Sequence, residues 1–302
     1  MKFILTALSL STLMTNYSFG QGCSDAGFCT INSFKPGSSG ASIDTLTNQF
    51  KIGTLLGRAD KFISVYGSYL EFNKQLNKKF GTDIKLTTLV QNGNGISANG
   101  FSDVFLNANY QASDKLKLTL GTKIPLSNSG KSLNKLPLPM DYQSSLGTFD
   151  LIFGVGYEIN KLQVVAAVQQ PLTQNDNQFF ASSYSFGSKL RTFQSTRRFR
   201  RMGDVLFRIS YPILFNHKLR VTPSILPIYH LANDKYSDEF NFENEIKGSQ
   251  GLTLNGNIYL DFEMNRKNKI QINVGIPFVV RDSRPDGLTR SFIINLEYSI
   301  KF

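Results

Sequence analysis

The chain has 302 residues, of which 41% are hydrophobic and 12% aromatic, with 33 Lys and Arg against 22 Asp and Glu. After the first twenty residues no window supplies the roughly twenty consecutive apolar residues that a transmembrane helix needs, so the sequence excludes a helical membrane protein. The formal charge of +11 is a common feature of nucleic-acid-binding proteins, but an exported protein meets anionic lipopolysaccharide or anionic solutes instead. We therefore expect no nucleic-acid partner.

Residues 1–20 have the pattern of a secretory signal peptide. A short charged start at Met1 and Lys2 precedes an apolar stretch over residues 3–14, and residues 18–20 form a small-x-small cleavage site. The alternative is a lipoprotein with its lipid on Cys23, but the apolar residue expected three positions before such a cysteine is missing. We expect cleavage before Gln21 and export of the mature chain.

Residues 21–48 are expected to form an N-terminal periplasmic or plug segment. The two cysteines of the chain, Cys23 and Cys29, lie six residues apart in this segment. In an oxidising compartment they most simply form a small disulfide loop.

Residues 49–302 contain twelve segments in which apolar and polar residues alternate with the period of a β-strand. They are 49–56, 62–72, 83–90, 102–110, 115–126, 147–159, 161–171, 200–213, 219–231, 251–263, 269–280 and 289–302. The connections alternate in length: 111–114, 160–161, 215–218 and 265–268 are short, and 127–146, 173–199 and 232–250 are long. An even strand number with short periplasmic turns and long extracellular loops predicts an all-β fold, an antiparallel up-and-down transmembrane β-barrel of about twelve strands.

Three of the predicted hairpins repeat one pattern at intervals of roughly fifty residues. Each has an Asp, a Tyr seven positions later, a tight turn, a Lys-Leu pair and a Pro. The aspartates are Asp103, Asp150 and Asp204, and the tyrosines are Tyr110, Tyr157 and Tyr211. A spacing of seven places the Asp and the Tyr on opposite faces of a strand. The tyrosines would form a periplasmic belt facing lipid and the aspartates would face the lumen, unless the aspartates only start strands and satisfy loop amides.

The last strand, residues 291–302, carries six apolar residues on one face and polar residues such as Glu297 on the other. A strand with one apolar and one polar face that ends in an aromatic residue resembles the closing strand of bacterial outer-membrane barrels. This resemblance implies that Phe302 is recognised by the barrel-assembly machinery. The alternative is an ordinary strand over a soluble core, but six apolar positions is long for a globular strand.

A further resemblance covers about residues 101–302. Gly100, Asp103 and Tyr110, then Gly121, Lys123 and Pro125, with a second Gly-Asp at Gly203 and Asp204, resemble the outer-membrane transporter family associated with phenol-degradation pathways, relatives of the long-chain fatty-acid transporter barrels. The sequence departs from that pattern at Ser102, where the family usually has Gly, and in residues 21–48, which are short for the N-terminal plug of the fatty-acid transporters. The resemblance implies an outer-membrane location and transport of a small solute.

The basic run over residues 191–201 is the sharpest candidate for a binding site. If the strand parity of Asp204 continues through the run, Arg198, Arg200 and Arg208 point into the lumen and form an anion-selective ladder. The alternative is an extracellular loop whose arginines, Arg191 and Arg197 above all, bind lipopolysaccharide phosphates.

The predicted pore-lining residues are charged and lie at inward positions. They are Asp103, Lys123, Asp150, Arg198, Arg200, Asp204 and Arg208. If the hairpin pairs Tyr110 with Leu116, Lys123 stands opposite Asp103 as a lumen ion pair.

Catalytic chemistry is not expected. The two histidines, His217 and His230, have no Ser and acid at a recognisable spacing, and we interpret His230 as a hydrogen-bonding residue of the lumen or a loop. The sequence predicts no cofactor and no metal-ligand cluster.

We expect the barrel to pass a small solute passively, as a porin-like or transporter-like protein, either with a preference for anions or for small apolar or aromatic compounds. Twelve strands leave a narrow lumen, which Tyr259, Asp261, Asn257 and residues 21–48 would obstruct. The expected partners are outer-membrane lipid, lipopolysaccharide and the solute. The alternative is a closed barrel that acts as a surface-binding or assembly scaffold through its long extracellular loops.

Overall fold

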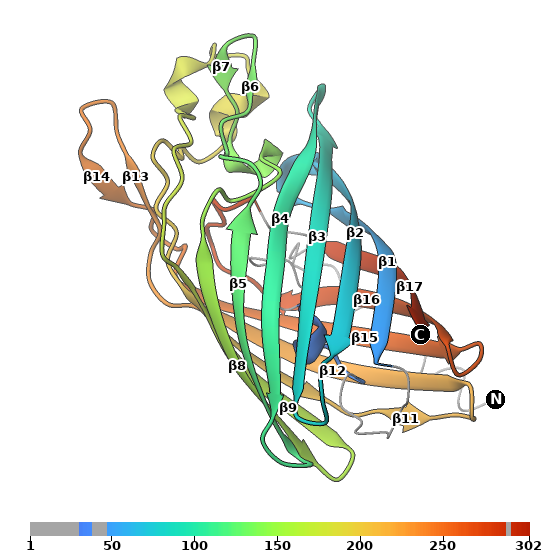
Figure 1. Ribbon diagram of the computed structural model, residues 1–302. Helices are drawn as coiled ribbons and strands as arrows, with labels where there is room; N and C mark the ends of the chain where they lie inside the picture. The colour runs from blue at the N-terminus through green and yellow to red at the C-terminus, as the bar shows by residue number, and fades with distance from the viewer. Residues whose placement is uncertain (1–29, 38–46, 288–290) are drawn as a thin grey trace, which may run out of the picture.

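Figure 1 shows the computed structural model of the chain, which describes residues 30–37, 47–287 and 291–302. Thirteen strands hydrogen-bond into one antiparallel sheet, and the pairing of β10 with β12 closes that sheet into a barrel. The two-residue strand β11 (Ile213–Leu214) continues β10 along β12, so the wall has twelve strands. The predicted fold class, strand order and strand number are confirmed.

The wall strands pair with their neighbours in the chain, and the first pairs with the last. They are β1 (Asn48–Arg58), β2 (Ser64–Gln75), β3 (Phe80–Gly93), β4 (Ile96–Gln111), β5 (Leu116–Pro125), β8 (Asp150–Ile159), β9 (Leu162–Pro171), β10 (Asp204–Ser210), β12 (Leu219–His230), β15 (Gly251–Glu263), β16 (Asn268–Val279) and β17 (Phe292–Lys301). The β10 strand starts four residues later than predicted, which removes residues 200–203 from the wall.

The remaining elements are short and lie outside the wall. They are the strands β6 (Ser132–Leu133), β7 (Leu136–Pro137), β13 (Lys235–Ser237) and β14 (Glu243–Glu245), and the 3₁₀ helices η2 (Asn32–Phe34), η3 (Asp60–Phe62), η4 (Met140–Tyr142), η5 (Ala181–Ser183) and η6 (Lys189–Thr192). Within the described residues no helix is long and apolar enough to cross a membrane.

Strand side chains alternate between the lumen and the exterior. In β15, Asn257 and Tyr259 are buried inside the barrel, whereas Ile258 is 51% exposed outside. In β17, Glu297 points inward and Leu296 is 50% exposed. The predicted faces of both strands are therefore confirmed.

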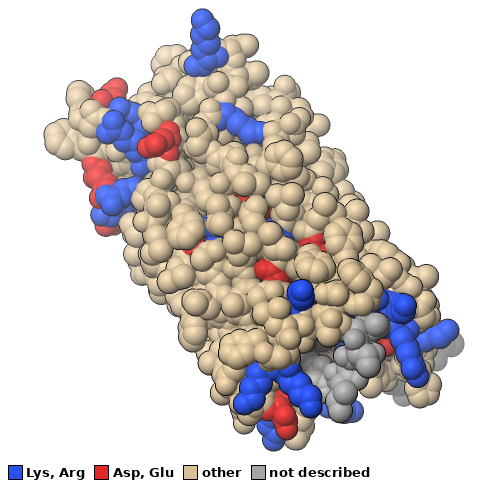
Figure 2. Space-filling view, viewed as in Figure 1, with Lys and Arg blue, Asp and Glu red and all other residues tan. Residues whose placement is uncertain are grey.

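The barrel exterior is a belt of exposed apolar side chains, among them Ile52, Leu70, Ile84, Leu120 and Ile272. Figure 2 shows one face of this wall as mostly uncharged, with Lys, Arg, Asp and Glu gathered most densely at its two ends. An apolar surface of this extent around a closed barrel faces lipid, since a closed barrel satisfies every backbone hydrogen bond without water. The barrel therefore spans an outer membrane.

The two ends of the barrel differ in their connections. The backbone amide of Asn48 bonds to the Phe302 carbonyl, so the first and last strands meet at the end that carries the short turns. The opposite, extracellular end carries the long connections 126–149, 172–203 and 231–250, which we call the cap together with residues 280–287. The predicted sets of short and long connections are confirmed, and the connections 59–63 and 94–95 at the extracellular end are also short.

The core of the molecule lies inside the barrel and under the cap. One cluster of buried apolar side chains joins the segment 30–37 to inward residues of the wall and to the cap, and includes Phe34, Ile152, Leu206 and Phe199. A second cluster lies under the cap beside β1–β4 and is centred on Tyr142 and Phe179. The lumen is therefore partly filled by protein.

Candidate functional site

A row of charged side chains lines one side of the lumen on β1, β2 and β3. In the strand register Lys51 lies opposite Glu71, and Glu71 lies opposite Lys85. The Lys51 Nζ is 3.0 Å from Glu71 Oε1 and 3.6 Å from Oε1 of Glu297 on β17. All four side chains are buried. Buried ions are tolerated when they are paired, and three of these four are.

We call residues 30–37 the plug, because they lie inside the barrel and contact its wall. Lys35 of the plug pairs with Glu297 at 2.7 Å. From the wall, Lys85 donates to Thr30 Oγ1 at 2.8 Å. Glu297 on β17 and Lys85 on β3 therefore both hold the plug against the wall.

The plug also fits the wall sterically at Phe34. Arg208, inward on β10 and buried, donates to the Phe34 carbonyl. The Phe34 ring lies against Gly154 of β8, where an added Cβ would come within 2.3 Å of the ring. A side chain at position 154 would therefore displace the plug.

Lys123 and Asp150 form a fully buried ion pair between β5 and β8, with Nζ and Oδ2 2.9 Å apart. Lys123 also donates to Thr148 Oγ1 at 2.9 Å, and Gln169 donates to Asp150. The prediction that Lys123 pairs with Asp103 is wrong.

The reason is a two-residue difference in register. Tyr110 stands opposite Leu118 rather than Leu116, which places Asp103 opposite Pro125. A slip of two residues changes the cross-strand partners but keeps every side chain on its face, so Asp103 still lies inside the barrel.

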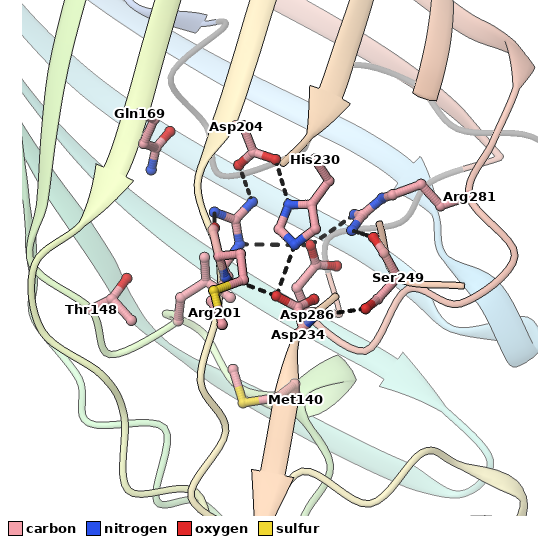
Figure 3. Close-up of polar contacts among 12 residues, drawn as sticks. Met140, Thr148, Gln169, Arg201, Asp204, His230, Asp234, Ser249, Arg281 and Asp286 are labelled. Carbon is pink, nitrogen blue, oxygen red and sulfur yellow. Dashed lines mark hydrogen bonds and ion pairs between the residues drawn. The ribbon is translucent and has the colours of Figure 1, made fainter. Parts of the chain in front are cut away.

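A cluster of ion pairs closes the extracellular mouth, and we call it the mouth cluster (Figure 3). Its members are Arg201, Asp204, His230, Asp234, Arg281 and Asp286. Asp204 binds Arg201 and lies 2.7 Å from His230 Nδ1, and His230 Nε2 lies 2.8 Å from Asp234. The Asp286 carboxylate binds Arg281 at 3.0 Å.

The mouth cluster joins the cap to the wall. Burial alone would raise the pKa of the Asp286 carboxyl, but Arg281, Arg201 and His230 hold that pKa below its ordinary value. A charged Asp286 also lies 3.8 Å from Arg201 Nε, which binds the connection after β16 to the connection 172–203. The interpretation of His230 as a hydrogen-bonding residue is confirmed, because carboxylates engage both of its ring nitrogens.

The predicted arginine ladder is wrong for two of its three members. Arg198 and Arg200 are exposed, because β10 begins only at Asp204 and both arginines lie in the connection before it. Arg200 instead pairs with Glu243 of the β13–β14 hairpin at 2.6 Å, and Arg197 donates to the carbonyl of Asp238 in the same hairpin. Only Arg208 points inward as predicted.

The three repeat aspartates Asp103, Asp150 and Asp204 are buried inside the barrel, while Tyr157 and Tyr211 are exposed on its outer face. The opposite orientation of the Asp and the Tyr is confirmed in these hairpins. The alternative in which the aspartates serve only loop amides does not describe Asp150 and Asp204, since both bind cationic side chains.

A cavity of about 100 Å³ lies in the lumen between the plug and the cap. Lys35, Lys85, Asp103, Asp286 and Glu297 are its charged lining residues. Its apolar and aromatic lining consists of Leu55, Tyr69, Leu89, Phe105, Leu146, Tyr259 and Ile293. The lining therefore combines apolar, charged and neutral polar side chains.

Several residues of the site were missed by reading the sequence. Lys51, Glu71 and Lys85 occupy inward positions of neighbouring strands, so strand parity alone could have placed them in the lumen. Arg201 carried no such signal, because it lies in a connection whose backbone is not a strand.

No protein-family model and no curated protein matches the chain in sequence. Solved barrels resemble it in structure. The NanC porin covers 84% of this chain and 98% of its own at 9% identity, with a TM-score of 0.46. The toluene transporter TodX of Pseudomonas putida covers 94% and 96% at 9% identity and 0.43, and the β domain of the Bordetella autotransporter BrkA covers 86% and 100% at 10% identity and 0.45. The similarity is one of barrel architecture, which proteins of different function share.

Proposed function

We propose that this outer-membrane barrel passes a small solute passively through its lumen. The observation that carries the proposal is the cavity of about 100 Å³ between the plug and the cap, enclosed by a lipid-facing wall. A lumen without function would be expected to be packed throughout, because unfilled space weakens a core.

Passage requires the plug to move. Phe34 is fully buried and occupies the lumen against Gly154, and the buried Arg208 donates to the Phe34 carbonyl. Polar contacts such as Lys35 to Glu297 hold the plug, and its displacement is the step that opens the route.

The arginine ladder was the main argument for an anion-selective lumen, and the positions of its residues do not support it. Arg198 and Arg200 lie on the surface, and the cavity lining carries two lysines against three carboxylates. We propose that the solute is small and polar with an apolar part. A role in passing products of phenol degradation stays a prediction from the sequence resemblance alone.

The test is conductance of the purified protein in planar bilayers. Gly154→Ala should displace Phe34 and raise the mean current several-fold, because the added Cβ would come within 2.3 Å of the ring. Gly156→Ala is the matched control, since the nearest atom to an added Cβ there lies 3.9 Å away. Equal currents for wild type, Gly154→Ala and Gly156→Ala would contradict a solute route past the plug.

The second candidate is a surface scaffold. The β13–β14 hairpin extends from the extracellular end of the barrel (Figure 1), and Phe240 and Phe242 near its tip are 72% and 70% exposed. Exposed aromatic residues of this kind are enriched at protein interfaces. A barrel that never conducts but binds a surface partner through Phe240 and Phe242 would favour this function.

A further inference from the structure

Two oppositely charged side chains line the same cavity without touching each other. Lys85 on β3 and Asp103 on β4 are both buried and both face the cavity between plug and cap. Among the described residues, neither has an ion-pair partner within 4.0 Å. A buried charge without a partner is unfavourable, and this cavity has one of each sign.

The Lys85 ammonium is held in place by neutral groups. It donates to Thr30 Oγ1 at 2.8 Å and to the Thr30 carbonyl at 3.4 Å, and it lies 4.3 Å from the centre of the Tyr69 ring. Its cross-strand neighbour Glu71 instead binds Lys51. An ammonium group can donate three hydrogen bonds, so Lys85 retains donor capacity for an anionic group in the cavity.

The Asp103 carboxylate is held by hydroxyl groups. Ser102 Oγ donates to it at 2.9 Å and Ser145 Oγ at 2.7 Å. A carboxylate has roughly four acceptor positions, so Asp103 can also accept bonds from a cationic group. Ser102, the residue that departs from the family pattern, thus orients this carboxylate.

A third observation is a buried acceptor without a donor. The side-chain oxygen of Asn273 on β16 has no hydrogen-bond partner among the described residues, and Asn273 lines the cavity. Asn273 as a whole is 7% exposed. Buried polar atoms are normally bonded, so this oxygen is available to a ligand with a hydrogen-bond donor.

The apolar side of the cavity is formed by Leu55, Leu89 and Ile293, with Phe105 and Leu146 beside them. One water needs roughly 10–15 Å³ of such space, so about 100 Å³ admits a molecule of roughly ten non-hydrogen atoms or fewer.

We infer that this cavity binds a small zwitterion with an apolar side chain, that is, an α-amino acid. Lys85 binds its carboxylate, Asp103 and the Asn273 oxygen bind its ammonium group, and the leucine and isoleucine side chains contact its apolar part. The inference rests on the proposed function and names the solute class that the lumen recognises.

The experiment is equilibrium binding of labelled L-leucine to the full-length folded protein in detergent. Two analogues compete: 4-methylpentanoate, which lacks the amino group, and 3-methylbutylamine, which lacks the carboxylate. Wild type should bind L-leucine at least tenfold more tightly than either analogue. This comparison needs no variant, so it holds whether or not the substitutions fold.

Variants then separate the two charges. Lys85→Met should weaken L-leucine and 4-methylpentanoate at least tenfold and leave 3-methylbutylamine unchanged, and Asp103→Asn should do the reverse. The controls are Lys117→Met and Asp83→Asn, inward charges that do not line this cavity, and both should bind as wild type does.

Absence of saturable binding, or equal affinity for L-leucine and the analogues, would overturn the zwitterion site. Solute flux through liposomes is measured on the same preparations. Flux without saturable L-leucine binding removes this inference and keeps the proposed function, whereas tight binding without flux removes the proposed function and keeps the site.

Discussion

Replacing Lys123 with Met should destabilise the barrel by about 3–5 kcal/mol, because it leaves the Asp150 carboxylate buried without its cation. Neither side chain of the pair is exposed to solvent. The substitution also removes the hydrogen bond to Thr148, which contributes about 1 kcal/mol. Gln169 still donates to Asp150 in the variant, so the total loss of folding free energy should stay within that range.

The double variant Lys123→Met/Asp150→Asn should recover most of the loss, since no unpaired charge then remains in the lumen. The assay is urea unfolding in detergent micelles, followed by circular dichroism because the chain has no tryptophan. The control is Arg200→Met, which breaks an ion pair whose side chains are 55% and 36% exposed and should cost under about 1 kcal/mol. Equal losses for Lys123→Met and Arg200→Met, or a double variant less stable than both singles, would refute the buried pair.

The remaining predictions concern the outer face, the cap and the N-terminal segment. Ile258→Arg should cost about 2–4 kcal/mol in the same unfolding assay, and a cost near zero would show that this face does not contact lipid. Burial raises the pKa of Asp141 in the cap to about 7, so its stabilising contribution is complete below pH 4 and is lost as the pH rises through 7. The melting temperature of Asp141→Asn relative to wild type should therefore increase between pH 4 and pH 7.5, and a constant difference contradicts the assignment. Cys23 and Cys29 lie outside the described residues; we predict no free thiols in the exported protein, with the barrel still folded after reduction.

The wall was predictable from the sequence because one face of each strand contacts lipid and the other faces the lumen, so apolar and polar residues must alternate along the strand. Ile258 must face lipid and Asn257 must not, so a period of two locates both. The same rule places Asp103, Asp150 and Asp204 in the lumen. Asn255 lies on the same inward face as Asn257 and is fully buried.

The site was less predictable because it depends on register and on connections. The register of β4 and β5 differs from the predicted one by two residues. Lys123 therefore pairs with Asp150 instead of Asp103, although both aspartates still lie inside the barrel. The prediction that Arg200 points into the lumen was wrong for a different reason. The parity of Asp204 does not extend backwards through Gly203, since both are buried, and the loss of strand geometry there reverses which arginine is buried. Arg201, rather than Arg200, enters the mouth cluster.

The mouth cluster and the plug arise from contacts between segments far apart in the chain. Arg208 and Phe34 are separated by 174 positions, and Lys35 and Glu297 by 262. No local pattern encodes such pairs, because each residue is compatible with an exposed position in its own segment. Only the closed wall brings them together.

The measurement that tests passive passage most directly is swelling of liposomes that contain the folded wild-type barrel. In iso-osmotic glycerol or glycine these liposomes should swell faster than protein-free liposomes, and in a tetrasaccharide such as stachyose they should not, because the cavity is small. Swelling at the protein-free rate in every solute, with the barrel shown to be folded, would contradict passage and favour the surface scaffold.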